Sequence, residues 1–212
     1  MGWQRLPSGR HKLSPESVTA SQRGRLLAAA VQVIGERGWS ATRVADVVAR
    51  AGVSRRTFYE LFDGLDACFA EAIESLLDGL LDALDDAARA ASGLGFEQRV
   101  RLFFDGYVGV LDATPGLARA AHLEMIRATD EIHAQHAALI RALASRMHRA
   151  LRTSSRGRSV QAPPLEFFVM LIGGMDQLIR ERIADGSGSL DGFAARATAL
   201  VCSAVGAAVR SS

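Results

Sequence analysis

The first third of the chain has apolar residues at the spacing of amphipathic helices. Leu27, Ala30, Val31 and Ile34 stand at positions i, i+3, i+4 and i+7, which is the period of one buried helix face. Gly38 follows them at a position typical of a helix end. The pattern predicts a first helix that starts after a polar segment of residues 1–18 and stops at Gly38.

Two shorter helices are predicted next, separated by a break of about three residues. Thr42, like Ser40 before it, is a candidate N-cap for the first of them, Gly52 marks the break, and Ser54 starts the second. The apolar positions are Val44, Val47, Val48 and Ala51 in the first helix and Phe58, Leu61 and Phe62 in the second. This arrangement is that of a helix-turn-helix unit.

Longer helical patterns fill the rest of the chain. A long helix with Asp63 as its expected N-cap spans about residues 63–91, and Pro115 ends the helix after it. The remaining helices are expected at about 116–127, 129–152, 163–185 and 189–210, with a polar loop at 153–162 and a Gly-Ser-Gly linker at 186–188. The sequence therefore predicts an all-α protein of about nine helices.

The composition agrees with an all-α fold, and the N-terminal third of the chain is more basic than the rest. The sequence holds 36 Ala and five Pro, which favours helices over sheets. Residues 1–60 carry ten Lys or Arg against four Asp or Glu, whereas residues 61–212 carry fifteen against nineteen. A basic N-terminal third attracts polyanions. We expect a flexible basic arm at 1–18, a helix-turn-helix DNA-binding domain at 19–66, and an effector-binding and dimerisation domain at 67–212.

Several functional classes find no support in the sequence. Cys68 and Cys202 lie 134 positions apart in apolar helical stretches, which is neither a disulfide framework nor a metal-binding spacing. The most apolar stretches, 165–179 and 193–209, are shorter than the ~20 residues that span a bilayer. No secretory signal, nucleophile elbow, phosphate loop or dinucleotide fingerprint is present. We expect a cytoplasmic protein without membrane contact, cofactor, metal or catalytic residues.

The segment Thr42–Phe69 resembles the DNA-binding signature of TetR-family regulators. An A-G-V-S turn at 51–54, a T-F-Y recognition helix at 57–59 and Phe62 occur in register, after a helix ending in Gly38-Trp39. Detailed resemblance covers about residues 23–69, and beyond it helix number and length agree. One departure is Leu65, where the family commonly has a phosphate-contacting Lys. The resemblance implies a DNA-binding dimer formed by two apolar C-terminal helices.

The predicted recognition helix presents polar groups opposite Phe58 and Phe62. A helix that enters the major groove needs such an exposed face, and Arg55 or Arg56 can donate two hydrogen bonds to a guanine. Hydroxyls and helix N-termini are better suited to phosphates, and the remaining arginines add sequence-independent charge. The predicted DNA-binding residues are Arg23, Arg25, Thr42, Arg43, Ser54, Arg55, Arg56, Thr57 and Tyr59.

Aromatic, methionine and polar residues in the second domain can line a cavity between helices, although we expect most of them to be core and about a third to touch a ligand. The predicted effector pocket comprises Phe103, Phe104, Tyr107, His122, Met125, Phe168, Met175 and Asp176. His133 and His136, three positions apart, are a weak metal signal because no HExxH pattern or cysteine pair accompanies them.

Small residues in the last two helices lower helix propensity, by about 1 kcal/mol for each Gly, and close helix approach would offset that cost. The predicted dimer interface comprises Phe167, Gly173, Gly174, Ala195, Ala199 and Gly206. The alternative is that the same faces pack within one chain.

These observations predict a TetR-type transcriptional regulator, a repressor released from a palindromic operator by a small, largely apolar effector. Its expected partners are double-stranded DNA, a second copy of the chain and that effector. An architectural DNA-binding dimer without an effector is one alternative, and an enzyme with a helical-bundle active site is another. Residues 67–212 are more than dimerisation alone needs, which favours effector control.

Overall fold

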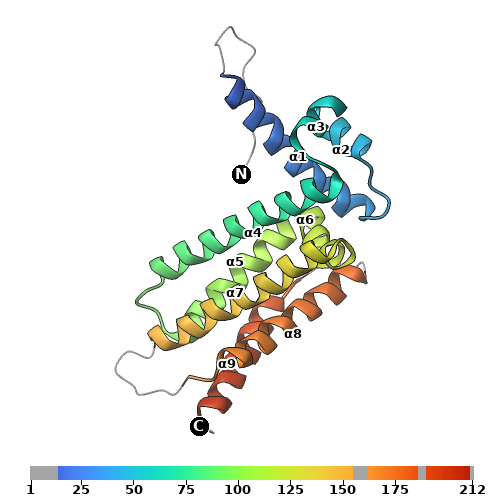
Figure 1. The fold of residues 1–212 in the computed structure, drawn as a ribbon. Coiled ribbons are helices and arrows are strands. Elements are labelled where there is room, and N and C mark those ends of the chain that lie inside the picture. Colours follow the sequence, from blue (N-terminus) through green and yellow to red (C-terminus); the bar gives the residue numbers. More distant parts are fainter. Residues whose placement is uncertain (1–13, 155–161, 186–189, 211–212) are drawn as a thin grey trace.

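The structure is a computed structural model that describes residues 14–154, 162–185 and 190–210. Every regular element within these ranges is helical, which confirms the all-α prediction (Figure 1). The α-helices are α1 (Pro15–Arg37), α2 (Val44–Ala51), α3 (Arg55–Leu61), α4 (Leu65–Ala90), α5 (Phe96–Ala113), α6 (Pro115–Arg119), α7 (Asp130–Ser154), α8 (Leu165–Ala184) and α9 (Phe193–Arg210). After α6 the chain continues as a π-helical turn at Ala120–Glu124 and a 3₁₀ turn at Met125–Arg127.

The first helix starts earlier than its apolar pattern indicated. Ser14 is the N-cap of α1, and its side chain accepts a hydrogen bond from the amide of Ser17 at 3.2 Å. The flexible arm predicted for residues 1–18 is therefore wrong for its last part, since α1 begins at Pro15. The rest of that arm, residues 1–13, and the 186–188 linker lie outside the described residues.

Glycines end α1 and α2 as the sequence indicated. Gly52 has a φ of +62°, in the left-handed region, and its amide donates to the carbonyl of Val48. The predicted N-caps are partly wrong. α2 is preceded by Arg43, whose amide donates to Asp46 Oδ2 at 3.0 Å, and α4 is preceded by Gly64 rather than capped by Asp63.

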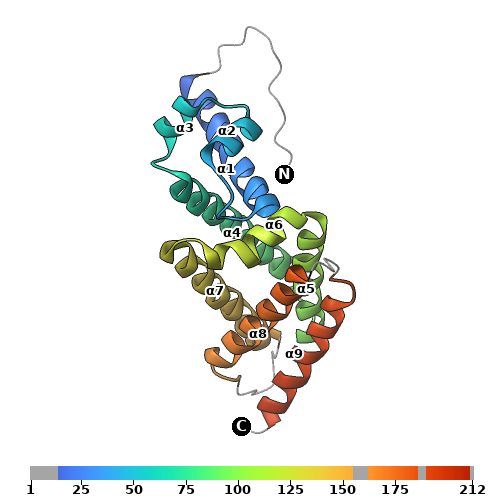
Figure 2. The same ribbon diagram turned by 90° about the vertical axis from the view of Figure 1, so that its right-hand side faces the viewer.

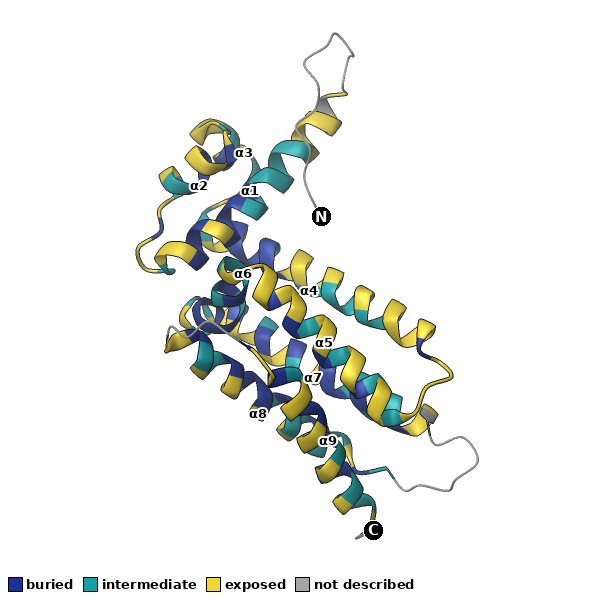
Figure 3. Ribbon diagram, turned by 180° about the vertical axis from the view of Figure 1, so that it is seen from behind, coloured by how far each residue is buried: buried dark blue, intermediate teal, exposed yellow. Residues whose placement is uncertain are grey.

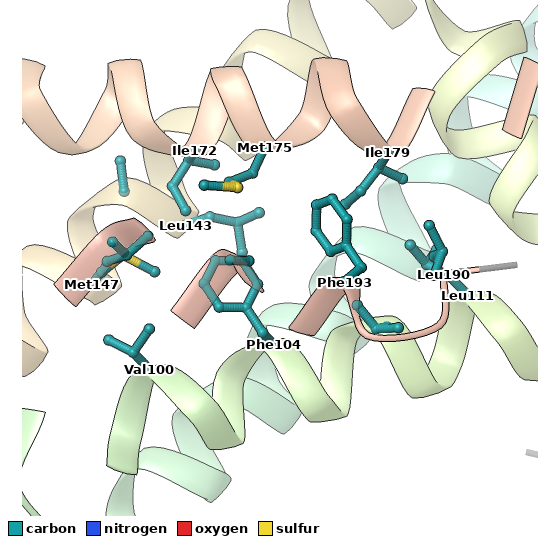
Figure 4. Packing of buried hydrophobic residues seen from close by; sticks show 14 of the residues in the cluster. Val100, Phe104, Leu111, Leu143, Met147, Ile172, Met175, Ile179, Leu190 and Phe193 are labelled. Carbon is teal, nitrogen blue, oxygen red and sulfur yellow. The ribbon is translucent and has the colours of Figure 1, made fainter. Parts of the chain in front are cut away.

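Buried apolar side chains form two separate clusters. The N-terminal cluster joins α1, α2 and α3 to the first turns of α4 through Phe58 and Phe69, both fully buried. The C-terminal cluster lies among α5, α7, α8 and α9, and Figure 4 shows Phe104 and Phe193 within it. Because its first turns lie in one cluster and its later turns pack on the other, α4 connects the two cores.

The two parts of the molecule meet where α1 approaches α6. A Cβ added at Gly35 would lie 2.0 Å from the carbonyl oxygen of Gly116, so only a glycine fits there. Arg119 Nε donates to the carbonyl of Gly35 at 2.9 Å. α5, α7, α8 and α9 form the C-terminal bundle. α6 lies between the helix-turn-helix and this bundle in both ribbon views (Figures 1 and 2).

In the C-terminal bundle α5 packs along α9 and α7 packs along α8, which leaves the outer faces of α8 and α9 exposed (Figure 3). Met170 is 74% exposed, Leu200 56% and Leu178 43%. Among the described helices, α9 is the one that is long and apolar enough by length and composition to cross a membrane. The inner face of α9 packs in the protein core, since Phe193, Val201 and Val205 are buried in the C-terminal cluster.

Candidate nucleic-acid interface and effector site

The short helix α3 is fixed from its buried side and capped at its start. Phe58 is completely buried and Phe62 nearly so, and the two rings lie 5.6 Å apart. The Ser54 hydroxyl accepts a hydrogen bond from the amide of Thr57 at 3.0 Å, as expected for an N-cap. Tyr59, 56% exposed, points away from this core. The anchored inner face leaves the outer face of α3 available to a partner.

Arg55 and Arg56 lie at the start of the outer face of α3. The Arg56 side chain is 89% exposed, and its Nε donates to Glu60 Oε1 at 2.8 Å. Arg55 is exposed, with no side-chain hydrogen bond or ion pair to any described residue. An exposed i,i+4 ion pair contributes little to stability, so DNA can displace Glu60 from Arg56 at low cost.

The residues before α2 are less accessible than the sequence suggested. Thr42, predicted as a phosphate contact, is 2% exposed, and its hydroxyl donates to the carbonyl of Gly38 at 2.8 Å. Its side chain is therefore not presented to DNA in this structure, which corrects that prediction. Arg43 is exposed, and its guanidinium donates to the carbonyl of Ser40 at 2.8 Å.

Two arginines of α1 brace the helix-turn-helix. Arg23 forms an ion pair with Glu71 of α4 and lies over the Phe62 ring, 4.7 Å from its centroid. Arg25 donates to the carbonyl of Ala51 at 3.1 Å. Sequence reasoning assigned both to DNA contact, and the structure shows that their guanidinium groups hold α1 against α4 and α2.

A buried polar network joins three residues of the predicted effector pocket. Tyr107 Oη lies 3.0 Å from His122 Nε2, and His122 Nδ1 lies 2.9 Å from Asp176 Oδ1. Two residues that the sequence did not assign complete the network, because His136 Nε2 is 3.2 Å from Asp176 Oδ2 and Arg180 forms an ion pair with the same oxygen. The network connects α5, the π-helical turn, α7 and α8.

The carboxyl group of Asp176 is held in its ionised form. Burial disfavours that charge, but hydrogen bonds from His122 and His136 outweigh it and hold the pKa of Asp176 well below its usual range. Burial also raises the pKa of the Tyr107 hydroxyl. Within the described ranges, no group of three or more His, Cys, Asp or Glu side chains is placed to hold a metal ion.

The other predicted pocket residues divide between core and surface. Phe104, Phe168 and Met175 belong to the C-terminal cluster (Figure 4). Met125 was wrongly grouped with them, because it is fully buried in the N-terminal cluster. Phe103 lines a cavity.

That cavity, of about 440 Å³, lies at the end of α4 far from the helix-turn-helix. α4, α5 and α7 line it, together with Ala91 and Ser92 after α4. Its apolar wall includes Leu84, Val100, Phe103 and Met147, and its basic residues are Arg89, Arg99, Arg146 and Arg149. Sequence reasoning missed these arginines because they lie on surface positions of three helices that come together only in the fold.

The residues predicted for a dimer interface lie mostly on the open faces of α8 and α9. Gly174, Ala195 and Ala199 are exposed, and no atom lies within 4 Å of a Cβ built at Gly173 or Gly174. Phe167 and Gly206 are half-buried. Gly173 and Gly174 are therefore not required for close packing between helices of the described chain.

Comparison with known families identifies the N-terminal region. Residues 26–72 match the family model described as bacterial regulatory proteins, tetR family. The helix-turn-helix region is thus similar to the N-terminal region of tetR-family regulatory proteins. An HTH-type transcriptional regulator of Bacillus subtilis, YvdT, is 33% identical over 66 residues, which cover 31% of this chain and 34% of that protein. The match thus spans about a third of the curated relative, and it supports a helix-turn-helix in the N-terminal region.

Solved structures extend the likeness in fold to the whole chain. The fatty acid degradation regulator FadR from Bacillus halodurans has a TM-score of 0.75, with 18% identity over 90% of this chain and 96% of that one. FadR from Bacillus subtilis, solved with stearoyl-CoA, has a TM-score of 0.70, with 16% identity over 88% of this chain and 97% of that one. The C-terminal bundle is therefore part of a fold that this chain shares with these two regulators.

Proposed function

We propose that the protein is a dimeric transcriptional regulator that binds a palindromic operator and responds to a small, largely apolar effector. The observation that carries this proposal is the outer face of α3. Ser54 caps the helix, Phe58 anchors it, and Arg55 and Arg56 begin the exposed side. A short, rigidly held helix with exposed guanidinium groups is suited to reading base edges in the major groove.

A second copy of the chain supplies the second reading helix. The faces of α8 and α9 that carry Met170, Leu178 and Leu200 are exposed in the single chain, and small residues beside them permit close helix approach. A two-fold dimer requires half-sites about one helical turn apart, near ~34–36 Å. Substituting Leu200 with Arg is expected to yield monomers in sedimentation analysis and to weaken operator binding.

Selection of bound sequences from random DNA, followed by footprinting, tests the DNA-binding proposal. We expect a palindromic consensus protected on both half-sites. Arg55→Ala or Arg56→Ala is expected to relax the preference at one base pair in each half-site and to weaken binding roughly tenfold or more. Arg101→Ala, on the exposed side of α5, is the matched control. Recovery of no sequence preference at all would favour an architectural role instead.

The size of the second domain and the presence of a cavity support effector control. The cavity of about 440 Å³ falls within the range of small-molecule sites. One structural neighbour was solved with stearoyl-CoA, which supports an effector with a long apolar part. Release from DNA is the proposed response, so saturating effector should lower operator affinity. An effector that binds without changing that affinity would contradict the regulatory proposal.

A further inference from the structure

Three arginines near the far end of the bundle have no acidic partner among the described residues. Arg99 donates to the carbonyls of Ser92 and Leu94, at 2.7 and 3.0 Å, and to the hydroxyl of Thr153 at 2.7 Å. All three acceptors are neutral, so the guanidinium is held in place while its charge stays uncompensated. Arg149 and Arg152 are exposed on α7, and neither guanidinium forms an ion pair or a hydrogen bond with another described residue.

The other two arginines of the cavity are neutralised. Arg146 forms a two-pronged ion pair with Asp85 of α4, with contacts of 2.6 and 3.1 Å, and Arg89 pairs with Asp86. Asp85 is the acidic residue among those that line the cavity. The positive potential therefore arises from Arg99 and Arg149, which are the groups available to an incoming anion.

A second hollow adjoins the first one and extends the basic surface. It has a volume of about 490 Å³ and is lined by Ser145, His148, Arg149, Arg152, Thr153 and Leu165. The two hollows share Arg149 and Thr153. Positions 145, 149 and 152 are spaced by four and three residues, so they lie on one face of α7. Basic and hydroxyl groups thus line this side, and no acidic side chain is among the residues named.

The first cavity also has an apolar wall that continues into the protein core. Val100 is 2% exposed and Met147 3%, and both belong to the C-terminal cluster. Phe103 and Leu84 pack against that cluster from the cavity side. An apolar chain bound along this wall would be removed from water and gain the free energy of burial.

We infer that this site binds an amphiphilic anion, with its carboxylate or phosphate at Arg99 and Arg149 and its alkyl chain against Phe103 and Met147. The inference rests on the proposed function, since it identifies the chemical class of the effector. It differs from the pocket expected around His122 and Asp176, where those polar groups already satisfy one another. Guanidinium groups bind carboxylates and phosphates alike. The class of ligand is therefore defined by its negative charge and its alkyl chain.

Calorimetric titration of the full chain with four ten-carbon probes tests the site. Decanoate and decyl phosphate are the anionic probes and distinguish the two headgroups, decanol is the neutral one, and decyltrimethylammonium is the cationic one. We expect at least one anion to bind roughly tenfold or more tightly than decanol and the cation, with an affinity that falls as salt rises. Equal binding of decanol and both anions would overturn the inference, as would no binding of any probe.

Charge variants locate the binding site. Arg149→Gln is expected to weaken binding of the preferred anion roughly tenfold while leaving decanol unchanged, and Arg149→Glu to weaken it further. Arg141→Gln, two turns earlier on an exposed position of α7, is the matched control. Unchanged anion binding by folded Arg149→Glu protein would overturn the assignment. Operator binding measured without any probe separates the two proposals, because loss of anion selectivity with intact operator binding would count against this site alone.

Discussion

Glu124 Oε2 accepts a hydrogen bond from the backbone amide of Trp39 at 2.8 Å, across 85 positions of sequence. Glu124 lies in the π-helical turn after α6 and is 2% exposed, whereas Trp39 follows α1 at the edge of the helix-turn-helix. Arg127 is 3.5 Å from the other carboxylate oxygen. A buried carboxylate thus joins the helix-turn-helix region to the segment that leads into the C-terminal bundle.

Replacing this carboxylate tests how firmly the two parts are joined. Glu124→Ala leaves the part-buried Trp39 amide without its acceptor and is expected to destabilise the protein by about 1–3 kcal/mol. Glu124→Gln retains an acceptor and should cost less. Urea unfolding measures both variants, with Glu74→Ala on the exposed side of α4 as the control. Equal stability of Glu124→Ala and the parent protein would show that the bond contributes nothing.

The contact between α1 and α6 gives a prediction with an internal control. A Cβ at Gly35 would lie 2.0 Å from the carbonyl oxygen of Gly116. Because that oxygen belongs to the backbone, α1 and α6 must move apart to make room for the Cβ. Gly35→Ala is expected to destabilise the protein by about 1–3 kcal/mol. Gly79→Ala, in α4 with nothing within 4 Å of its Cβ, should instead stabilise it by about 0.5–1 kcal/mol. Thermal unfolding of the two variants should shift in opposite directions.

The helix-turn-helix could be predicted from sequence because its signals are local. Gly38 and Gly52 both take a positive φ at the ends of their helices, and Ser54 caps α3, as their positions along the chain indicated. Phe58 and Phe62 face the core for the same reason, since helical spacing alone assigns them to one side. Short-range rules therefore sufficed to place the buried and exposed faces of α3.

The second domain could be predicted only in outline, because its sites depend on tertiary approach. Arg146 and Asp85 meet across 61 positions, and nothing in either helix alone indicates the pair. Met125 was misassigned because the segment before it forms a π-helical turn, whose wider winding rotates later side chains away from the α-helical face. His136 was missed because it meets Asp176 only where α7 packs on α8, whereas Arg180 lies one turn after Asp176 on α8, a spacing that the sequence does show.

The buried network around Asp176 makes stability depend on pH on the acid side. The pKa of Asp176 is lowered in the folded state, so its contribution is present above the unfolded value of about 3.9 and is lost as the pH falls through the folded value. Asp176→Asn removes the charge that His122 and Arg180 pair with. It should cost about 3–5 kcal/mol at pH 7.

The acid dependence of unfolding checks this prediction. The difference in stability between the parent protein and Asp176→Asn should shrink as the pH is lowered from about 4 toward 2, the range over which a depressed carboxylate titrates. Asp105→Asn is the control, because Asp105 is half-exposed on α5 and pairs with Arg101 at the surface. A difference that stayed constant with pH would indicate a packing defect rather than loss of an ionised carboxylate.

The last prediction concerns coupling between the proposed effector cavity and the proposed reading helices. α4 begins beside α3 at Leu65 and ends at Ala90 beside the cavity, a span of roughly 40 Å at ~1.5 Å per residue. Near its start Glu71 pairs with Arg23, and near its end Asp85 pairs with Arg146. A ligand that displaces the end of α4 can therefore change the placement of the helix-turn-helix and the distance between the two reading helices of a dimer.

If the effector favours the arrangement that does not bind DNA by ~1–3 kcal/mol, operator affinity should fall ~5–150-fold at saturation, and DNA should weaken effector binding by the same factor. Phe103→Ala, at the cavity wall, is expected to reduce the effector response while leaving effector-free operator affinity nearly unchanged. Phe104→Ala is the contrasting variant, because Phe104 is 2% exposed in the core and its loss should lower stability by about 3–5 kcal/mol. The measurement is operator affinity with and without a ligand that binds stoichiometrically. Equal affinities in the two conditions would remove α4 as a coupling element and leave the second domain as a means of dimerisation.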